Sequence, residues 1–167
     1  MNEIFTRRSV RKFLPQPVEE EKIEKMLRAG MAAPSAGNQQ PWEFYVVRDK
    51  KILQDLSHCS LYAGCAAKAP AAIVVCSRDD NMRFRAFANL DLSACVENIL
   101  LEAVCLGLGA VWLGVAPYAS RELNVRRAIG IPKGLTAFAV IPVGYAADTV
   151  EERAKEDSFD PDRIHYV

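Results

Sequence analysis

The stretch DLSACVENILLEAVCLGLGAVWLG, residues 91–114, decides the fold of this chain. The C-terminal half of the helix expected here is apolar on nearly every face, a pattern typical of a helix at the centre of a domain. We expect this helix to begin near Arg83 and to end at Gly107 and Gly109. Residues 110–115 then have the composition of a buried strand. A central helix that runs into a buried strand indicates a domain in which helices cover a sheet.

Helix and strand patterns are mixed along the rest of the chain. We expect strands over residues 42–47, 71–76 and 136–143, and further helices over residues 18–30, 50–56 and 120–129. The strand AAIVVC at 71–76 is apolar at every position, so it should be covered on both faces. Gly30 marks the expected end of the first helix, and Ser120 is the expected cap of the last one. The mixture indicates an α+β or α/β sandwich.

Length and charge limit the classes of protein that fit. The chain has 167 residues, which suits one domain over residues 1–167. Lys and Arg together number 21 and balance 21 Asp and Glu, so there is no global attraction to nucleic acid or an anionic membrane. The most apolar stretch, residues 99–117, contains Glu102 and three glycines, so it does not fit a membrane span. With no secretory signal at the start, we expect a cytoplasmic protein.

The cysteines do not form a metal or disulfide pattern. There are five cysteines at irregular spacing and two histidines, so we expect neither a metal site nor a disulfide framework. Cys76, Cys95 and Cys105 lie in apolar segments and are expected to be buried thiols. A catalytic thiol at Cys59 beside His58 is a weaker alternative, because neighbours in sequence rarely face each other as nucleophile and base.

A basic segment near the N-terminus has the composition of an anion site. The segment Arg7-Arg8-Ser9-Val10-Arg11-Lys12 holds four cations and one hydroxyl in six residues. Guanidinium forks and hydroxyl donors hold a phosphate well, because charge-assisted hydrogen bonds are strong. A solvated basic turn or a nucleic-acid contact would have the same composition.

Two further segments are suited to a planar ligand. In Ala33–Trp42, two prolines bracket small residues and amides, and amides offer both the donor and the acceptor that the edge of a heterocycle requires. A well-capped turn into the strand at Trp42 is the alternative. In residues 107–115, the GLG sequence precedes a strand and is not a dinucleotide-binding turn. Gly114 would let a backbone approach a ligand closely, or it is a bulge.

Taken together, these segments resemble the nitroreductase family of FMN-dependent oxidoreductases. The resemblance covers nearly the whole chain in order. Its motifs are RRSVRKF at 7–13, PSAGNQQPWEFYVV at 34–47, KAPAAIVVC at 68–76, the stretch at 91–114, IGIPKGL at 129–135 and PVGY at 142–145.

The resemblance implies a three-layer α/β/α sandwich that forms an intertwined homodimer, with FMN at the subunit interface. It assigns the FMN phosphate, ribityl chain and pyrimidine edge to Arg7, Arg8, Ser9 and Arg11. It assigns the isoalloxazine wall to a loop from the other subunit, with Pro34, Ser35, Ala36 and Asn38. It places the backbone of Leu113 and Gly114 along the ring face near N5.

The C-terminal segment departs from the family pattern. Many members carry an Arg or Lys directly before an aromatic-Asp pair, where it helps to neutralise the FMN phosphate. Here Ser158 precedes Phe159-Asp160, so either Arg153 or Lys155 substitutes, or the N-terminal arginines hold the phosphate alone. Residues from about 146 to 167 are expected to form an arm that docks on the partner subunit.

The implied activity is a ping-pong reaction in which NAD(P)H delivers a hydride to flavin N5 and a nitroaromatic, a quinone or a similar flat electrophile then receives it. No catalytic side chain is required, because the flavin carries the chemistry. A flavin-binding electron-transfer protein reduced by a protein donor, or a dehalogenase-type member of the same fold, is the alternative. The short segment 77–85, with Arg78, Arg83 and Arg85, meets an anionic substrate or is a solvated helix start, and Tyr62 is a pocket wall or a core residue.

Overall fold

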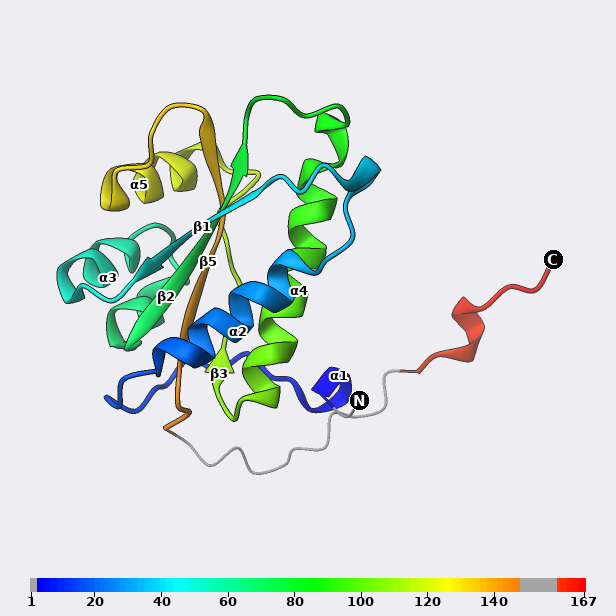
Figure 1. The fold of residues 1–167 in the computed structure, drawn as a ribbon. Helices are drawn as coiled ribbons and strands as arrows, with labels where there is room; N and C mark the ends of the chain where they lie inside the picture. Colours follow the sequence, from blue (N-terminus) through cyan, green and yellow to red (C-terminus); the bar gives the residue numbers. More distant parts are fainter. Residues whose placement is uncertain (1–2, 148–158) are drawn as a thin grey trace.

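The computed structural model describes residues 3–147 and 159–167, and its centre is an antiparallel sheet (Figure 1). The strands are β1 (Trp42–Val47), β2 (Ala71–Arg78), β3 (Gly109–Ala110), β4 (Leu113–Gly114) and β5 (Leu135–Gly144). Their order is β1-β2-β5-β3, and β4 also pairs with β5. The two long central strands are in register at Ile73 with Ile141 and at Val74 with Val140.

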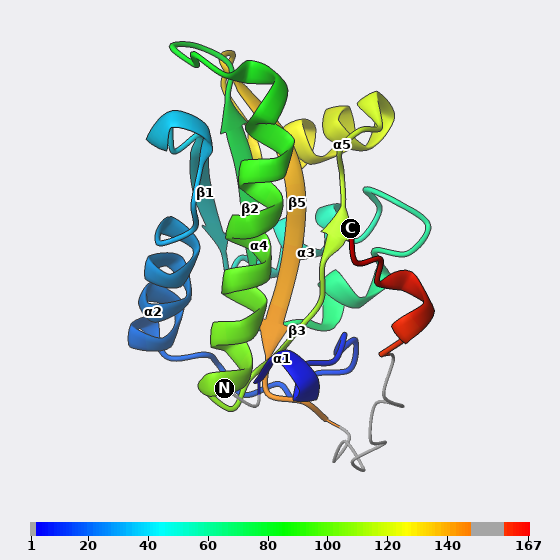
Figure 2. The ribbon, with the colours of Figure 1, turned by 90° about the vertical axis from the view of Figure 1, so that its right-hand side faces the viewer.

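Helices cover both faces of this sheet (Figures 1 and 2). The α-helices are α1 (Glu3–Thr6), α2 (Glu20–Met31), α3 (Lys50–Leu56), α4 (Ala88–Cys105) and α5 (Ala119–Ile129). Short 3-10 helices are η1 (Ala36–Asn38), η2 (Gly64–Lys68), η3 (Arg85–Phe87) and η4 (Pro161–Arg163). α2 and α4 lie on one face, and α3 and α5 lie on the other (Figure 2). The result is an α+β sandwich of three layers.

Strand β2 is buried on both faces, as its sequence predicts. Ile73 and Val75 pack into the cluster beneath α2 and α4, whereas Val74 and Cys76 pack into the cluster beneath α3 and α5. Each fully buried Val or Ile side chain contributes roughly 1.5–3 kcal/mol relative to an exposed one. The alternation of side chains along one strand therefore ties the two helical layers to the same sheet.

Helix α4 is the central helix, and α2 packs closely across it. Ile99 is fully buried, and a Cβ added to Gly30 would lie 2.9 Å from its side chain. The prediction that Gly30 ends the first helix is wrong, because α2 continues to Met31. A glycine is present at this position because the two helices approach closely, not because the first helix stops there.

Several other predicted boundaries differ from the structure. α4 begins at Ala88 rather than near Arg83, because residues 85–87 form η3 first. α5 begins at Ala119, so Ser120 lies inside its first turn and is not the cap. Cys105 is exposed at the end of α4, although it was expected to be buried.

The single strand predicted over residues 110–115 is two short strands. β3 pairs at Ala110 with Val143, and β4 pairs at Leu113 with Val140. Between these pairs the chain faces Pro142, whose carbonyl accepts from Val111 N at 3.3 Å. A proline has no N–H to return a hydrogen bond, so the ladder is interrupted there.

The C-terminal residues lie away from the rest of the molecule. Residues 159–167, which include η4, extend outward in Figure 1. Phe159, Ile164 and Tyr166 are exposed in this segment. Within the described residues, no helix is both long enough and apolar enough to cross a membrane.

Candidate flavin site

The basic N-terminal segment lies along the edge of the sheet. Ser9 forms a parallel bridge with Ala110, and Val10 N donates to Ala110 O at 3.0 Å. A Cβ on Gly109 would lie 2.7 Å from the Val10 side chain. Since real side-chain contacts are longer than this, Gly109 is what allows the basic segment to lie so close to β3. Residues about a hundred positions apart are thus brought side by side.

The arginines of this segment have different partners. Arg7 Nε lies 3.2 Å from Glu97 Oε1 on α4, and the Arg7 side chain is half-buried. Arg8 Nη1 donates to the carbonyl oxygens of Phe5 and Arg7, each at 2.9 Å. Arg11 is exposed, with a long contact of 3.5 Å from Nη1 to Ser9 O. Arg11 is therefore better placed than Arg7 to meet an anionic ligand.

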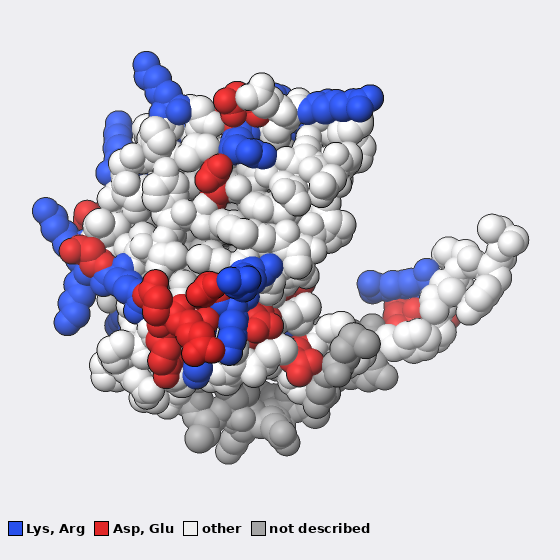
Figure 3. Space-filling view, in the orientation of Figure 1, with Lys and Arg blue, Asp and Glu red and all other residues white. Residues whose placement is uncertain are grey.

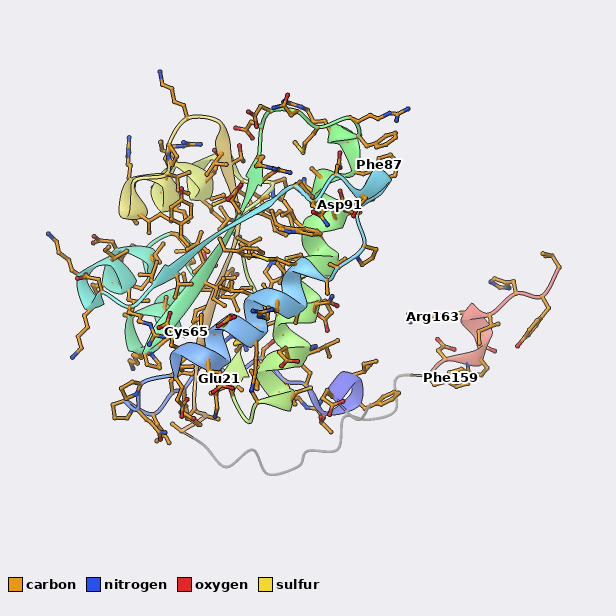
Figure 4. The ribbon with its side chains drawn as sticks, viewed as in Figure 1. Glu21, Cys65, Phe87, Asp91, Phe159 and Arg163 are labelled. Carbon is orange, nitrogen blue, oxygen red and sulfur yellow. The ribbon has the colours of Figure 1, made fainter. Side chains whose placement is uncertain are left out.

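The charge of Arg11 reaches the sulfur of Cys65 on η2. Burial raises the pKa of the Cys65 thiol, and the positive charge of Arg11 opposes that increase. Cys65, labelled in Figure 4, comes from the far side of the sheet from α4.

The backbone at Gly114 is open to approach. Among the described residues, the nearest atom to a Cβ added there would be Ala116 O, at 4.0 Å. Arg121 Nη1 donates to Gly114 O at 2.9 Å, and the guanidinium carbon lies 4.2 Å from the centre of the Tyr118 ring. Leu113 beside it is buried. This edge thus offers a fixed backbone with free space in front of it.

The loop over residues 34–41 has an unusual backbone. Gly37, Asn38 and Gln40 have φ angles of 55°, 55° and 46°, in the left-handed region. Gln40 N donates to Ser35 Oγ at 3.0 Å. Arg78 Nη2 donates to the carbonyl oxygens of Gln39 and Gln40, at 2.9 and 2.7 Å. This arginine, considered as a contact for an anionic substrate from sequence, holds the loop instead.

The loop lies at the other end of α4 from the basic segment (Figures 1 and 2). Its Ala36 N donates to Asp91 Oδ1 in the first turns of the helix, whereas Ser9 pairs beyond the helix C-terminus. With 18 residues, α4 spans about 27 Å. One chain therefore brings Arg7, Arg8, Ser9 and Arg11 to the edge that carries Leu113 and Gly114, and it holds Pro34, Ser35, Ala36 and Asn38 elsewhere.

Other residues considered from sequence lie as follows. Arg153 and Lys155 fall outside the described residues. Tyr62 is 75% exposed, so it is not a core residue of this chain. Arg83 is exposed, with its guanidinium 5.2 Å from the Phe84 ring centre, and Arg85 donates to the carbonyl oxygen of Asp79.

The structure opposes a catalytic thiol at Cys59. Its side chain is 3% exposed, and burial raises the pKa of the thiol, although Arg121 acts in the opposite direction. His58 is exposed. In residues 3–147 and 159–167, there is no group of three His, Cys, Asp or Glu side chains able to hold a metal ion.

Charged side chains on the face of α2 are paired with one another. Figure 3 shows residues of both signs gathered there. Glu21 lies 2.8 Å from Lys25, and Glu24 lies 2.6 Å from Arg28. Lys25 beside Glu21 lowers the pKa of that carboxyl group. This is a mixed-charge surface and not the basic stripe of a nucleic-acid binder.

The sandwich, with a basic segment and an open glycine backbone on one sheet edge, has the features of a flavin-binding oxidoreductase. Residues 4–63 and 54–145 match the family model described as the nitroreductase family. The chain belongs to the nitroreductase family, a family of FMN-dependent NAD(P)H oxidoreductases.

Similar proteins agree along almost the full length. A protein of Archaeoglobus fulgidus, provisionally named NADH dehydrogenase/NAD(P)H nitroreductase, is 44% identical over 163 residues, which are 97% of this chain and 94% of the relative. A crystal structure of a provisionally named NADH oxidase from Clostridium acetobutylicum has 45% identity and a TM-score of 0.92, and covers 98% of this chain and 97% of that one. An FMN-dependent nitroreductase from Clostridium difficile has 31% identity and a TM-score of 0.88, with coverage of 99% and 97%.

Sequence reasoning missed three residues that shape this site. Arg121 fixes the Gly114 carbonyl, and Asp91 and Gln39 tie the 34–41 loop to α4. The one available signal was Asp91, an acidic residue in the most apolar helix of the chain. Buried carboxylates are normally hydrogen-bonded, so an Asp in this helix indicates that hydrogen-bond donors lie close to it in the fold.

Proposed function

We propose that this chain is an FMN-dependent NAD(P)H oxidoreductase that reduces nitroaromatics, quinones or similar flat electrophiles. The observation that carries the proposal is the bridge between Ser9 and Ala110, which brings the 7–12 segment to the sheet edge that continues to Leu113 and Gly114. A phosphate needs guanidinium donors, and a planar ring needs an approachable backbone. The names of the similar proteins, which specify NAD(P)H and FMN, support the same assignment.

Residues of one chain would hold most of the cofactor. Arg8, Ser9 and Arg11 are assigned to its phosphate and polar edge, with Arg7 braced by Glu97 behind them. Arg11 would also stabilise negative charge that accumulates on a reduced ring, since a nearby cation favours the anionic form. Leu113 and Gly114 would lie along the ring. The tail residues Arg153 and Lys155 remain candidates for the phosphate.

Bound FMN would supply the redox chemistry of the site, the transfer of a hydride from NAD(P)H to the acceptor in two separate half-reactions. The residues of the chain bind and orient. Arg121 keeps the peptide after Gly114 in one orientation through its 2.9 Å hydrogen bond, so the backbone is set in advance. No side chain of the chain has to act as a nucleophile.

We further propose that two copies of this single-domain chain complete each site. The loop with Pro34, Ser35, Ala36 and Asn38 lies about the length of α4 from the basic segment. A second copy would bring its own loop to the first copy's arginines, and the extended residues 159–167 offer an apolar arm to that partner. A symmetric pair would then hold two equal sites.

The test is the absorbance spectrum of the purified protein, followed by anaerobic addition of NADH and NADPH. The proposal expects a flavin spectrum that is bleached by a nicotinamide and restored by a nitroaromatic or quinone. Bleaching by a protein donor alone would favour an electron-transfer protein. A colourless protein that cannot be reconstituted with FMN would overturn the proposal.

A further inference from the structure

We propose that Asp91 and Gln39 are positioning residues that set the 34–41 loop in its binding shape before any cofactor arrives. This inference rests on the proposed function, in which the loop lines the flavin. The two side chains form a clasp, by which we mean the hydrogen bonds that join Asp91, Gln39 and Phe84 to the loop.

The loop has a shape that its residues do not prefer. Asn38 and Gln40 are not glycines, yet both have left-handed φ angles, at 55° and 46°. Asn tolerates this region better than most residues, but it is unfavourable for Gln, and such a conformation persists only where the surroundings hold it. Contacts within the chain must therefore select this shape over the alternatives.

Asp91 supplies one part of the clasp from α4 (Figure 4). Its side chain is 6% exposed. Oδ1 accepts from Ala36 N at 3.0 Å, and Oδ2 accepts from Gln39 Nε2 at 2.7 Å. A buried carboxylate whose oxygens accept from two points on one loop fixes those points relative to the helix, because losing either donor would leave charge unsatisfied.

Gln39 supplies the second part by joining the loop to the segment before α4. Its Nε2 also donates to Phe84 O at 3.1 Å, and its Oε1 accepts from Phe84 N at 3.0 Å. The Phe84 ring then lies over the loop, where a Cβ on Gly37 would be 2.5 Å from a ring carbon. Helix, loop and preceding segment are thus locked to one another.

All of these bonds join residues of one chain, so the loop is shaped without the cofactor. A protein whose binding-competent conformation is only partly populated binds more weakly in proportion to that population. Holding the loop in advance should therefore tighten FMN binding while taking no part in the chemistry. Ala36 is both an anchor of the clasp and an expected wall of the flavin.

The experiment compares FMN dissociation constants, measured by flavin fluorescence on the apoprotein, with hydrogen exchange of the 34–41 segment in the same apoprotein. The variants are Asp91→Asn, Gln39→Glu and the two combined. Asn can accept from only one of the two donors. Glu at 39 places a second carboxylate against Asp91. In the combined variant, the Asn amide can donate to the Glu, which restores three of the four hydrogen bonds given above.

Each single variant should weaken FMN binding by about tenfold or more, as expected when a hydrogen bond to a charged group is lost. Exchange in the loop should become faster, and the combined variant should recover part of both effects. Asp80→Asn, which removes an exposed carboxylate nearby, is the matched control and should change neither. Gln39→Ala provides a milder break if Asp91→Asn does not fold.

Unchanged FMN affinity in Asp91→Asn and Gln39→Ala would overturn the inference, even if loop exchange became faster, because the clasp would then be structural only. Unchanged exchange would overturn it as well. If the unmodified apoprotein does not bind FMN, the proposed function fails, and with it the positioning role. Exchange then still decides separately whether the clasp shapes the loop.

Discussion

Replacement of Gly114 should separate cofactor binding from folding. Gly114 does not have a positive φ angle, unlike Gly37, Gly107, Gly130 and Gly134, so its backbone conformation is open to residues with a side chain. A Cβ at 114 would have Ala116 O as its nearest neighbour at 4.0 Å, an ordinary contact distance. Gly114→Ala should therefore leave the free energy of unfolding unchanged or raise it by up to about 1 kcal/mol, since glycine weakens a strand.

The same methyl group would enter the space assigned to the flavin ring. Forcing extra carbon into an occupied, well-packed site typically costs about 1–3 kcal/mol, which corresponds to roughly a 5- to 150-fold weaker FMN dissociation constant. Gly114→Val should have a larger effect on binding. For Gly114→Ala, a gain of about 1 kcal/mol in the free energy of unfolding, the upper end of the range, would raise Tm by roughly 2–4 °C for a chain of this size.

The assay is a thermal melt of the apoprotein together with an FMN titration. Gly109→Ala is the contrasting variant, because its Cβ would lie 2.7 Å from Val10 and should displace the basic segment. It should lose FMN binding together with stability. A Gly114→Val protein that melts normally and binds FMN as tightly as the unmodified chain would refute the placement of the ring along this edge.

Three further predictions follow from the site and the core. Arg11→Gln should release FMN from a folded protein, whereas Arg28→Gln, on the paired surface of α2, should not; equal retention in both would reject the role of Arg11. Mixed dimers of Arg8→Ala and Asn38→Ala chains should regain one intact site of two, as measured by FMN content, and no regain would show that the site is not shared. Burial raises the pKa of Cys76 and of Cys95 from 9.0 to about 12, so the folded state holds these protons longer than the unfolded state. The free energy of unfolding should then fall as the pH rises above about 9, which denaturation curves would measure. A thiol reagent should modify the exposed Cys105 before Cys76 or Cys95, which mass spectrometry would show.

The regular parts of the fold could be predicted from local patterns. The bounds of β1 and α3 are as expected, and β2 has both faces covered, because periodicity and composition report burial directly. The wrong predictions concern positions whose local structure depends on a residue far away in the sequence. Pro142 interrupts the strand expected over 110–115, and the approach of Ile99 explains Gly30 inside α2.

The site shows the same division. The motifs identified the basic segment, the loop and the Gly114 backbone, and their roles toward FMN stay predictions. The roles of Asp91 and Gln39 were not predicted, because the hydrogen bond between them joins residues 52 positions apart. No local pattern reports such a pair, and a single sequence contains no record of which donor will meet which carboxylate.

The seating of the basic segment has a consequence for how the protein is made. Ser9 pairs with Ala110, and Phe13 pairs with Ala146. During synthesis the N-terminal part emerges first, yet both of its neighbours in the sheet, Ala110 and Ala146, lie in the second half of the 167-residue chain. The basic segment therefore cannot pair with the sheet until Gly109 and Ala110 have been made. A chain cut short before residue 109 would contain Arg7, Arg8 and Arg11 but lack the strand with which Ser9 pairs, so the proposed phosphate site could form only in a chain that extends past Ala110.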